Sequence, residues 1–172
     1  MQRQKVDAFE AALRLLPQAR EALGAYPLSS EQKRLWLLAQ LTDAETLPVM
    51  ACYQFTGTMD IALVQQNLSA WVAHSEALRS VFVEVMGQPV RLLMPMGQVK
   101  LEYFQQLYAE NDLAEWVNAP FDLGLGPLLR IFIIRINAQC YELRLCGHPI
   151  VVDEYSLPVS YTHLTLPTIL RV

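Results

Sequence analysis

Apolar residues recur at helical intervals near the start of the chain and predict an amphipathic helix over residues 6–23. The apolar positions of that stretch are Val6, Phe9, Leu13, Leu16 and Leu23. Pro17 falls inside it and interrupts the helix, because proline lacks the N–H that a helix needs. We expect either a linker or docking helix ahead of the domain, or a surface helix packed on it.

Two further helices carry clear start signals. Within residues 26–41, Ser29 or Ser30 can accept hydrogen bonds from the first N–H groups of a helix. Asp60 can do the same for a helix that runs to about Ser75. The apolar stripe of this second helix consists of Leu63, Val64, Leu68, Trp71 and Val72.

Stretches rich in β-branched and aromatic residues predict the strands. They are residues 49–57, 78–84, 90–94, 99–104, 128–136 and 140–146. The Gly87-Gln88-Pro89 sequence is expected to form the turn of a hairpin, and residues 137–139 join the last two strands. Residues 111–117 are expected to be helical. This order of elements indicates an α+β or mixed α/β fold.

Composition narrows the kind of protein further. The 172 residues include 13 Lys and Arg against 17 Asp and Glu, for a net charge of −4, and 53% are hydrophobic. That length suits one domain or half of a larger one, and the hydrophobic content argues against disorder. An acidic chain without a basic run offers nucleic acid no electrostatic footprint, so we expect no nucleic-acid partner.

Targeting and redox signals are weak. No segment reaches the ~18 apolar residues of a membrane span, and the polar start of the chain does not resemble a signal peptide. Cys52, Cys140 and Cys146 are too few and too scattered for a disulfide framework or a zinc site, and each is expected to be a small buried hydrophobe. We therefore expect a cytoplasmic protein with no bound metal and no membrane partner.

The last fourteen residues, VSYTHLTLPTILRV, join nothing in the preceding pattern. Their first codons fit the transposon-end adapter used in sequencing libraries, and residues 165–168 fit its continuation. We expect residues 159–172 to be a translated adapter and leave them out of the fold prediction. A natural strand and loop is the alternative. On the first interpretation, the natural sequence is cut near Pro158.

The segment that follows the last predicted strand carries the residue types that are best suited to catalysis. The strand delivers His148 and then Asp153 into a loop. A histidine there can act as a general base or orient a substrate, and an aspartate can fix that histidine or an arginine. A histidine held only by local hydrogen bonds is an equally good interpretation. His148 and Asp153 are therefore the candidate catalytic residues.

Four motifs, in order along the chain, resemble the N-terminal half of the condensation domain of nonribosomal peptide synthetases. The family pattern SxAQxRLW is matched by residues 29–36, with Glu31 in the alanine position. The pattern RHExLRTxF is matched by residues 74–82, and FDLxxGPLLR by residues 121–130. The active-site pattern HHxxxDG is matched by residues 148–154, which read HPIVVDE.

The resemblance implies an α+β fold of two subdomains, each similar to chloramphenicol acetyltransferase, with a mixed sheet flanked by helices and a tunnel between the subdomains. Carrier protein domains dock at the tunnel mouths and present thioesters on phosphopantetheine, and no metal or directly bound cofactor is needed. Residues 1–23 would be a linker or docking helix and residues 24–158 the N-terminal subdomain. The C-terminal subdomain would be a missing partner.

The active-site motif departs from the family pattern at its most important position. In the family the second histidine is catalytic, and Pro149 stands in its place. Proline has no ionisable group and cannot accept a proton. His148 takes the first position, whose implied role is mainly structural.

The rest of the motif implies a supporting role for a charged pair. Asp153 matches an aspartate that forms a salt bridge with an arginine, and Arg79 or an arginine of the missing half is the candidate partner. Glu154 replaces the family glycine. Three functions stay open: amide formation by a condensation domain, with the fragment itself inactive; a non-catalytic recruitment or docking domain of the same fold; and ester formation.

Overall fold

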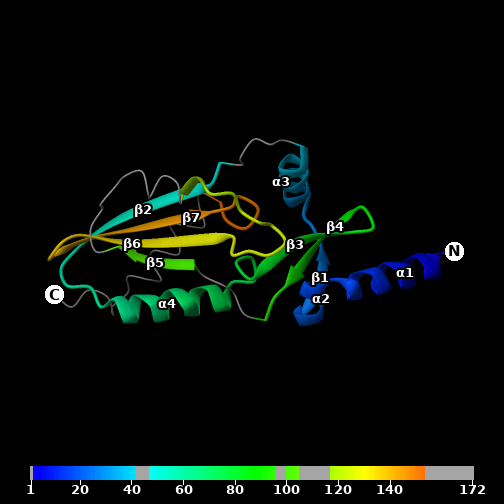
Figure 1. Ribbon diagram of the computed structural model, residues 1–172, viewed down its shortest axis with the longest axis horizontal. Coiled ribbons are helices and arrows are strands. Elements are labelled where there is room, and N and C mark those ends of the chain that lie inside the picture. Colours follow the sequence, from blue (N-terminus) through cyan, green and yellow to red (C-terminus); the bar gives the residue numbers. More distant parts are fainter. Residues whose placement is uncertain (1, 42–46, 96–99, 105–116, 154–172) are drawn as a thin grey trace.

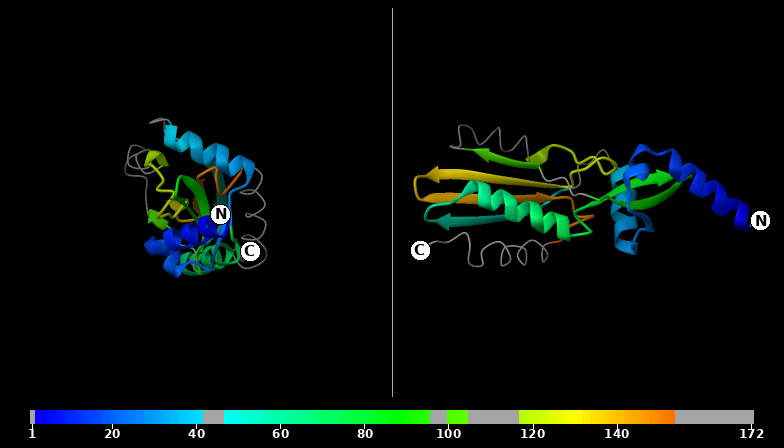
Figure 2. Two further views of the ribbon diagram at one scale, coloured as in Figure 1. Left: turned by 90° about the vertical axis from the view of Figure 1, so that its right-hand side faces the viewer. Right: turned by 90° about the horizontal axis from the view of Figure 1, so that it is seen from below.

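The computed structural model describes residues 2–41, 47–95, 100–104 and 117–153, with side chains of residues 2–8 and 100–104 excepted. Two sheets follow one another along the long axis of the molecule, with α4 along one face of the larger sheet and α1 extending beyond the smaller one (Figures 1 and 2). The elements are α1 Gln2–Leu15, α2 Pro17–Glu21, β1 Gly24–Pro27, α3 Ser30–Leu41, β2 Val49–Thr56, α4 Ile61–His74, β3 Ser80–Val85, β4 Gln88–Leu93, β5 Lys100–Phe104, β6 Leu129–Asn137 and β7 Cys140–Gly147.

The larger sheet has the strand order β2-β7-β6-β5. Strand β7 runs antiparallel to both β2 and β6, while β5 runs parallel to β6. Because β7 is hydrogen-bonded on both sides, its last residue, Gly147, lies opposite both Val49 and Leu129. The segment that follows β7 therefore begins next to a residue that both neighbouring strands hold in place.

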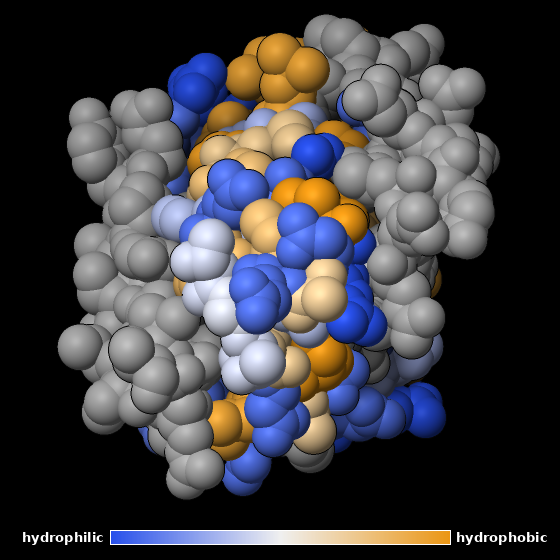
Figure 3. Space-filling model, turned by 90° about the vertical axis from the view of Figure 1, so that its left-hand side faces the viewer, coloured by the Kyte–Doolittle hydropathy of each residue, from blue (hydrophilic) through white to orange (hydrophobic). Residues whose placement is uncertain are grey.

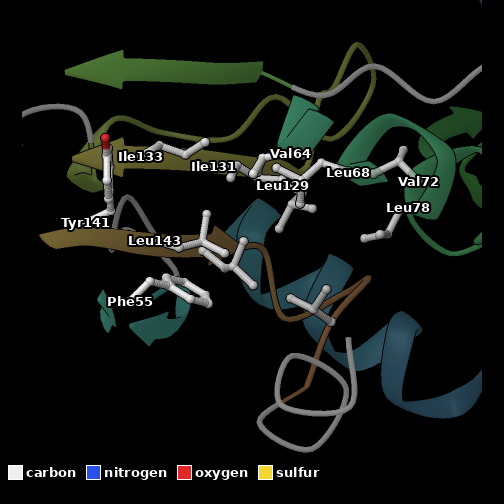
Figure 4. Close-up of a cluster of buried hydrophobic side chains, with 12 residues drawn as sticks. Phe55, Val64, Leu68, Val72, Leu78, Leu129, Ile131, Ile133, Tyr141 and Leu143 are labelled. Carbon is white, nitrogen blue, oxygen red and sulfur yellow. The ribbon is translucent and has the colours of Figure 1, made fainter. Parts of the chain in front are cut away.

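The main hydrophobic core lies between this sheet and α4 (Figure 4). Its buried members are Phe55, Val64, Leu68, Val72, Leu78, Leu129, Ile131, Ile133, Tyr141, Leu143, Leu145 and Val152. Helix α4 begins as predicted, since the Asp60 carboxylate accepts hydrogen bonds from the N–H groups of Ala62 and Leu63 at 3.0 and 3.2 Å. Burying each leucine or isoleucine of this core stabilises the fold by about 1.5–3 kcal/mol.

The smaller sheet is antiparallel, with the order β1-β4-β3. Its β1 strand was not predicted from sequence. Helix α1 packs on this sheet through Phe9 and Leu13, and α2 packs on it through Ala19. These side chains and Leu16, which lies between the two helices, pack against the valines of β3 and β4. The first two helices are thus attached to the smaller sheet.

The hairpin between β3 and β4 turns one residue earlier than predicted. Val85 pairs with Gln88, so the turn consists of Met86 and Gly87, with φ of 53° and 76°, and Pro89 lies inside β4. Two positive φ values define a type I′ turn, which matches the twist of the strands. The prediction was wrong because it placed the proline, and not the Met86-Gly87 pair, in the turn.

Met86 is the residue of this turn that is least suited to its conformation, because a residue with a Cβ is strained at positive φ. We expect Met86→Asn to raise the free energy of unfolding by up to about 1 kcal/mol. Urea unfolding of the wild-type chain and of Met86→Asn measures this change. Valine tolerates positive φ even less than methionine does, so Met86→Val should shift the unfolding midpoint to lower urea. Equal unfolding midpoints for the wild-type chain and the two variants would contradict the type I′ turn at Met86 and Gly87.

Other expectations from the sequence can be compared with the structure. Cys140 and Cys146 are buried as predicted, but Cys52 is exposed, because it points away from α4 on the edge strand β2. The helix expected over residues 111–117 lies almost wholly outside the described residues, as does the tail over residues 159–172. Within the described part, no helix is long and apolar enough to cross a membrane, and no cluster of metal-ligating side chains occurs.

Candidate functional site

His148 follows directly after β7 and starts a tight turn. Its side chain is buried, with 3% of the residue exposed. The His148 N–H donates to the carbonyl of Leu128 at 2.9 Å, and the His148 carbonyl accepts from the N–H groups of Val151 and Val152 at 3.0 and 3.2 Å. The backbone of His148 is therefore held by the segment before β6 and by its own loop.

The imidazole ring of His148 is held as well. Its Nδ1 accepts a hydrogen bond from the Ile150 N–H at 3.1 Å, so Nδ1 carries no proton and the neutral ring has its proton on Nε2. Burial lowers the pKa of His148 to about 4, because the charged form loses its hydration. At neutral pH, His148 is thus a neutral ring whose Nε2–H is a donor.

Pro149 has a local structural reason to be where it is. The hydrogen bond from Val151 to the His148 carbonyl closes a turn in which Pro149 is the second residue. Proline favours that position because its φ is already fixed near the required value and its missing N–H is not needed there. Pro149 therefore stiffens the turn.

One wall of the His148 site comes from the loop before β6. The Phe121 ring meets the His148 ring edge to face, with centroids 5.8 Å apart and an interplanar angle of 81°. Behind it, the Arg130 guanidinium carbon lies 3.9 Å from the Phe121 centroid. Arg130 also donates to the carbonyls of Ala119 and Pro120 at 2.7 and 2.8 Å. This stack shields the His148 ring from water.

Arg130 is itself largely buried, and burial lowers the pKa of its guanidinium. It lies on β6, and Phe121 lies nine residues earlier in the same motif. Sequence reasoning assigned neither residue to the site. The signal was present, since both belong to the FDLxxGPLLR match, but a motif does not say which of its members touches a histidine eighteen residues or more away.

The other two predicted site residues that the structure describes are Asp153 and Arg79. Asp153 lies at the exposed end of the loop. Arg79 is half-buried, and its Nη1 donates to the carbonyls of Met94 and Pro95 at 2.8 and 3.4 Å. Arg79 also lines a pocket of about 560 Å³ between α2, the start of β3 and the loop before β6. The Asp153–arginine pair stays a prediction, and Glu154 lies outside the described residues.

The buried His148 predicts how stability depends on pH. Between its folded pKa of about 4 and the ordinary value of 6.5, the unfolded chain binds a proton that the folded chain does not. Stability from this group is therefore fully present above pH 6.5 and is lost as pH falls toward 4. Allowing for solvent screening, we expect a loss of about 2 kcal/mol.

Urea unfolding at about pH 7 and about pH 4.5 measures this loss. Carboxylates also titrate in this range, so the informative quantity is the difference between the wild-type chain and His148→Gln, which should have the shallower pH dependence. His74→Gln is the matched control, because His74 is exposed on α4. If the pH dependence of the free energy of unfolding remained in His148→Gln and disappeared in His74→Gln, buried His148 would not be its cause.

The sequence matches one protein family over most of its length. The family model, the condensation domain, covers residues 22–165. The chain is 34% identical over 145 residues to surfactin synthase subunit 2 of Bacillus subtilis (strain 168), which is 82% of this chain and 4% of that protein. It is 32% identical over 151 residues to tyrocidine synthase 2 of Brevibacillus parabrevis, which is 86% of this chain and 4% of that protein. The chain thus spans a small part of these relatives.

Solved structures of condensation domains share the fold of this chain. The condensation domain of the Monacolin K polyketide synthase superposes with a TM-score of 0.75 at 20% identity, over 84% of this chain and 34% of that one. The starter condensation domain of rhizomide synthetase superposes with a TM-score of 0.72 at 17% identity, over 82% of this chain and 36% of that one. These matches confirm the mixed architecture of helices and sheets predicted from the sequence. The chain belongs to the condensation-domain family and covers about a third of the condensation structures that it resembles.

Proposed function

We propose that the chain is the N-terminal subdomain of a condensation domain in a cytoplasmic nonribosomal peptide synthetase. In the complete protein this domain would join acyl or aminoacyl groups that carrier protein domains hold as phosphopantetheine thioesters. The acceptor amine nitrogen attacks the thioester carbonyl carbon, the carbon–sulfur bond breaks, and the proton lost by the amine balances the released thiol. The match to the condensation-domain family and the similarity to surfactin synthase subunit 2 and tyrocidine synthase 2 support the proposal.

The single observation that carries the proposal is the His148 turn. The family motif falls on a loop that is fixed by the doubly paired strand β7, and its histidine is buried with all of its described backbone and Nδ1 hydrogen bonds inside the protein. A ring with a pKa of about 4 is a weak base at neutral pH. We infer that His148 shapes the site and offers its Nε2–H as a donor, and does not take the proton of the amine.

Without a histidine at position 149, the rate would come mainly from holding the two tethered reactants together. Well-oriented intramolecular reactions reach effective concentrations of roughly 10⁵–10⁸ M. A rigid loop suits that role, because a misplacement of even about 1 Å can cost a large factor in rate. The turn with Pro149 and the wall formed by Phe121 both favour such rigidity.

The surface of α3 supports the presence of a further partner. Its Leu37, Leu38 and Leu41 are 50%, 41% and 79% exposed. By contrast, the face at the far end of the larger sheet mixes hydrophilic and hydrophobic residues (Figure 3). Contiguous exposed apolar residues mark surfaces that other protein covers. In the complete synthetase, carrier protein domains and the second subdomain are the partners that the proposal names.

Pro149 also favours a second candidate function, namely a non-catalytic member of the family that recruits carrier protein domains. Such a domain needs the fold and the docking surface but no proton acceptor. The two candidates agree on the partners and differ in whether an amide bond forms.

A transfer assay with the complete protein separates the two candidates. The donor carrier is loaded with an acyl group and the acceptor carrier with an aminoacyl group, and the carrier-bound product is followed by mass spectrometry. Product formation well above the reaction of the two loaded carriers alone supports amide synthesis. Binding of loaded carriers with no product supports recruitment. The absence of both binding and product would remove the proposal.

A further inference from the structure

Gln32 lies at the start of α3 and forms part of its N-terminal cap. The Ser29 hydroxyl accepts a hydrogen bond from the Gln32 N–H at 3.2 Å, and the Gln32 side-chain oxygen, Oε1, accepts one from the Ser29 N–H at 3.1 Å. This reciprocal pair is a capping box. Because Oε1 must be the acceptor toward a backbone N–H, the orientation of the Gln32 amide is fixed, and its NH₂ group points elsewhere.

That NH₂ group reaches the His148 turn. Gln32 Nε2 donates to the carbonyl oxygen of Ile150 at 3.3 Å, across 118 positions of sequence. Ile150 is 3% exposed and packs with Leu35 and Trp36 of α3, so the two segments are also joined by apolar contact. The hydrogen bond gives the carbonyl of a buried residue a partner, as buried polar groups require.

Ile150 connects Gln32 to the imidazole ring. Its carbonyl accepts from Gln32, and its N–H donates to His148 Nδ1. One residue therefore links the cap of α3 to the ring nitrogen that determines the tautomer. Chains of hydrogen bonds of this kind orient a functional group more strictly than a single contact does.

We propose that Gln32 is a positioning residue of the His148 turn, which holds the imidazole in its Nε2–H form by fixing Ile150. Glutamine suits both of its contacts, because one amide supplies an acceptor for the cap and a donor for the loop. Glutamate would keep the first contact and lose the second. The inference rests on the proposed function only in regarding this turn as the reaction site, since the contacts themselves lie within the described chain.

Gln32→Glu and Ser29→Ala separate the two contacts of the amide. Gln32→Glu keeps the capping box and removes the donor to Ile150. Ser29→Ala removes the hydroxyl acceptor of the cap and leaves that donor. Gln32→Met, of similar volume, removes both and is the second test should the carboxylate disturb folding. The ¹⁵N-labelled 172-residue chain is compared with each variant by NMR.

The readouts are the two ring nitrogen shifts of His148, which report the tautomer, and the amide exchange rates of residues 150–152. In Gln32→Glu and Gln32→Met we expect at least about fivefold faster exchange at these amides, equivalent to ~1 kcal/mol, and a mixture of tautomers. In Ser29→Ala we expect faster exchange in the first turn of α3 with unchanged His148 signals.

Unchanged ring shifts and loop exchange in both Gln32 variants would overturn the proposal. So would a Ser29→Ala variant that disturbs the His148 ring as much as the Gln32 variants do, because the effect would then come from the helix cap. None of these readouts needs amide formation. A failed transfer assay would therefore count against the proposed function and leave the positioning role of Gln32 to be decided by NMR.

Discussion

Pro149→His in the complete protein is expected to raise the rate of amide formation by about 10²–10⁴-fold, the range that a well-placed general base contributes. His148 is buried, whereas residue 149 occupies the second position of the turn and is partly exposed, so a side chain there is more accessible than the His148 ring. An imidazole at that position would supply the proton acceptor that the resemblance to the family implies there. The measurement is single-turnover product formation from preloaded carriers.

Pro149→Ala is the matched control for this experiment. Both variants lose the proline ring at the second position of the turn, and each should lower the free energy of unfolding by about 0.4–1 kcal/mol. Only the histidine variant should gain rate. Equal rates in the two variants would show that the turn does not face the reacting groups, and would favour the recruitment function over amide synthesis.

Arg130→Ala is expected to lower the free energy of unfolding by about 2–4 kcal/mol. The substitution leaves the carbonyls of Ala119 and Pro120 without the guanidinium that donates to them, and it removes the cation that stacks on Phe121. Because Phe121 shields His148, the same variant should also raise the pKa of His148 toward its ordinary value. Urea unfolding measures the first effect, and an NMR titration of the ring measures the second.

Arg135→Ala provides a control on the same strand. Arg135 is more exposed than Arg130, donates to the carbonyl of Asn137 at 3.3 Å and lies 6.0 Å from the Tyr141 ring centroid. Its loss should cost less than about 1 kcal/mol and leave the pKa of His148 unchanged. A similar cost for both arginines would mean that the Arg130 stack does not contribute specifically to the site.

Long elements with one clear pattern could be predicted from the sequence. Helix α4 has both an Asp60 cap and an apolar stripe, and β6 and β7 are rich in apolar residues and bounded by turn residues. Strand β1 could not be found in this way. It has four residues, begins with Gly24 and ends with Pro27, and three of them are exposed. It is a strand only because β4 offers it hydrogen-bonding partners.

The same difference between local and non-local signals applies to the candidate site. His148 could be located because a strand ends just before it, which is a local signal. The contacts that decide its chemistry are not local. The Ile150 carbonyl is bound by Gln32 from α3, and the ring is covered by Phe121 from a loop before β6. The sequence showed that each of these residues lies in a motif, but their meeting depends on the way that the sheets bring the motifs together.

The position of β7 between β2 and β6 also governs how the chain can fold while the ribosome makes it. Strand β2 ends at Thr56, whose partner Cys140 is the first residue of β7. At about 5–20 residues per second, synthesis of the intervening stretch takes on the order of ten seconds. During that time β2 has no neighbour in the sheet, and open strand edges attract other chains. We therefore expect nascent chains of this protein to depend on chaperones until β7 emerges.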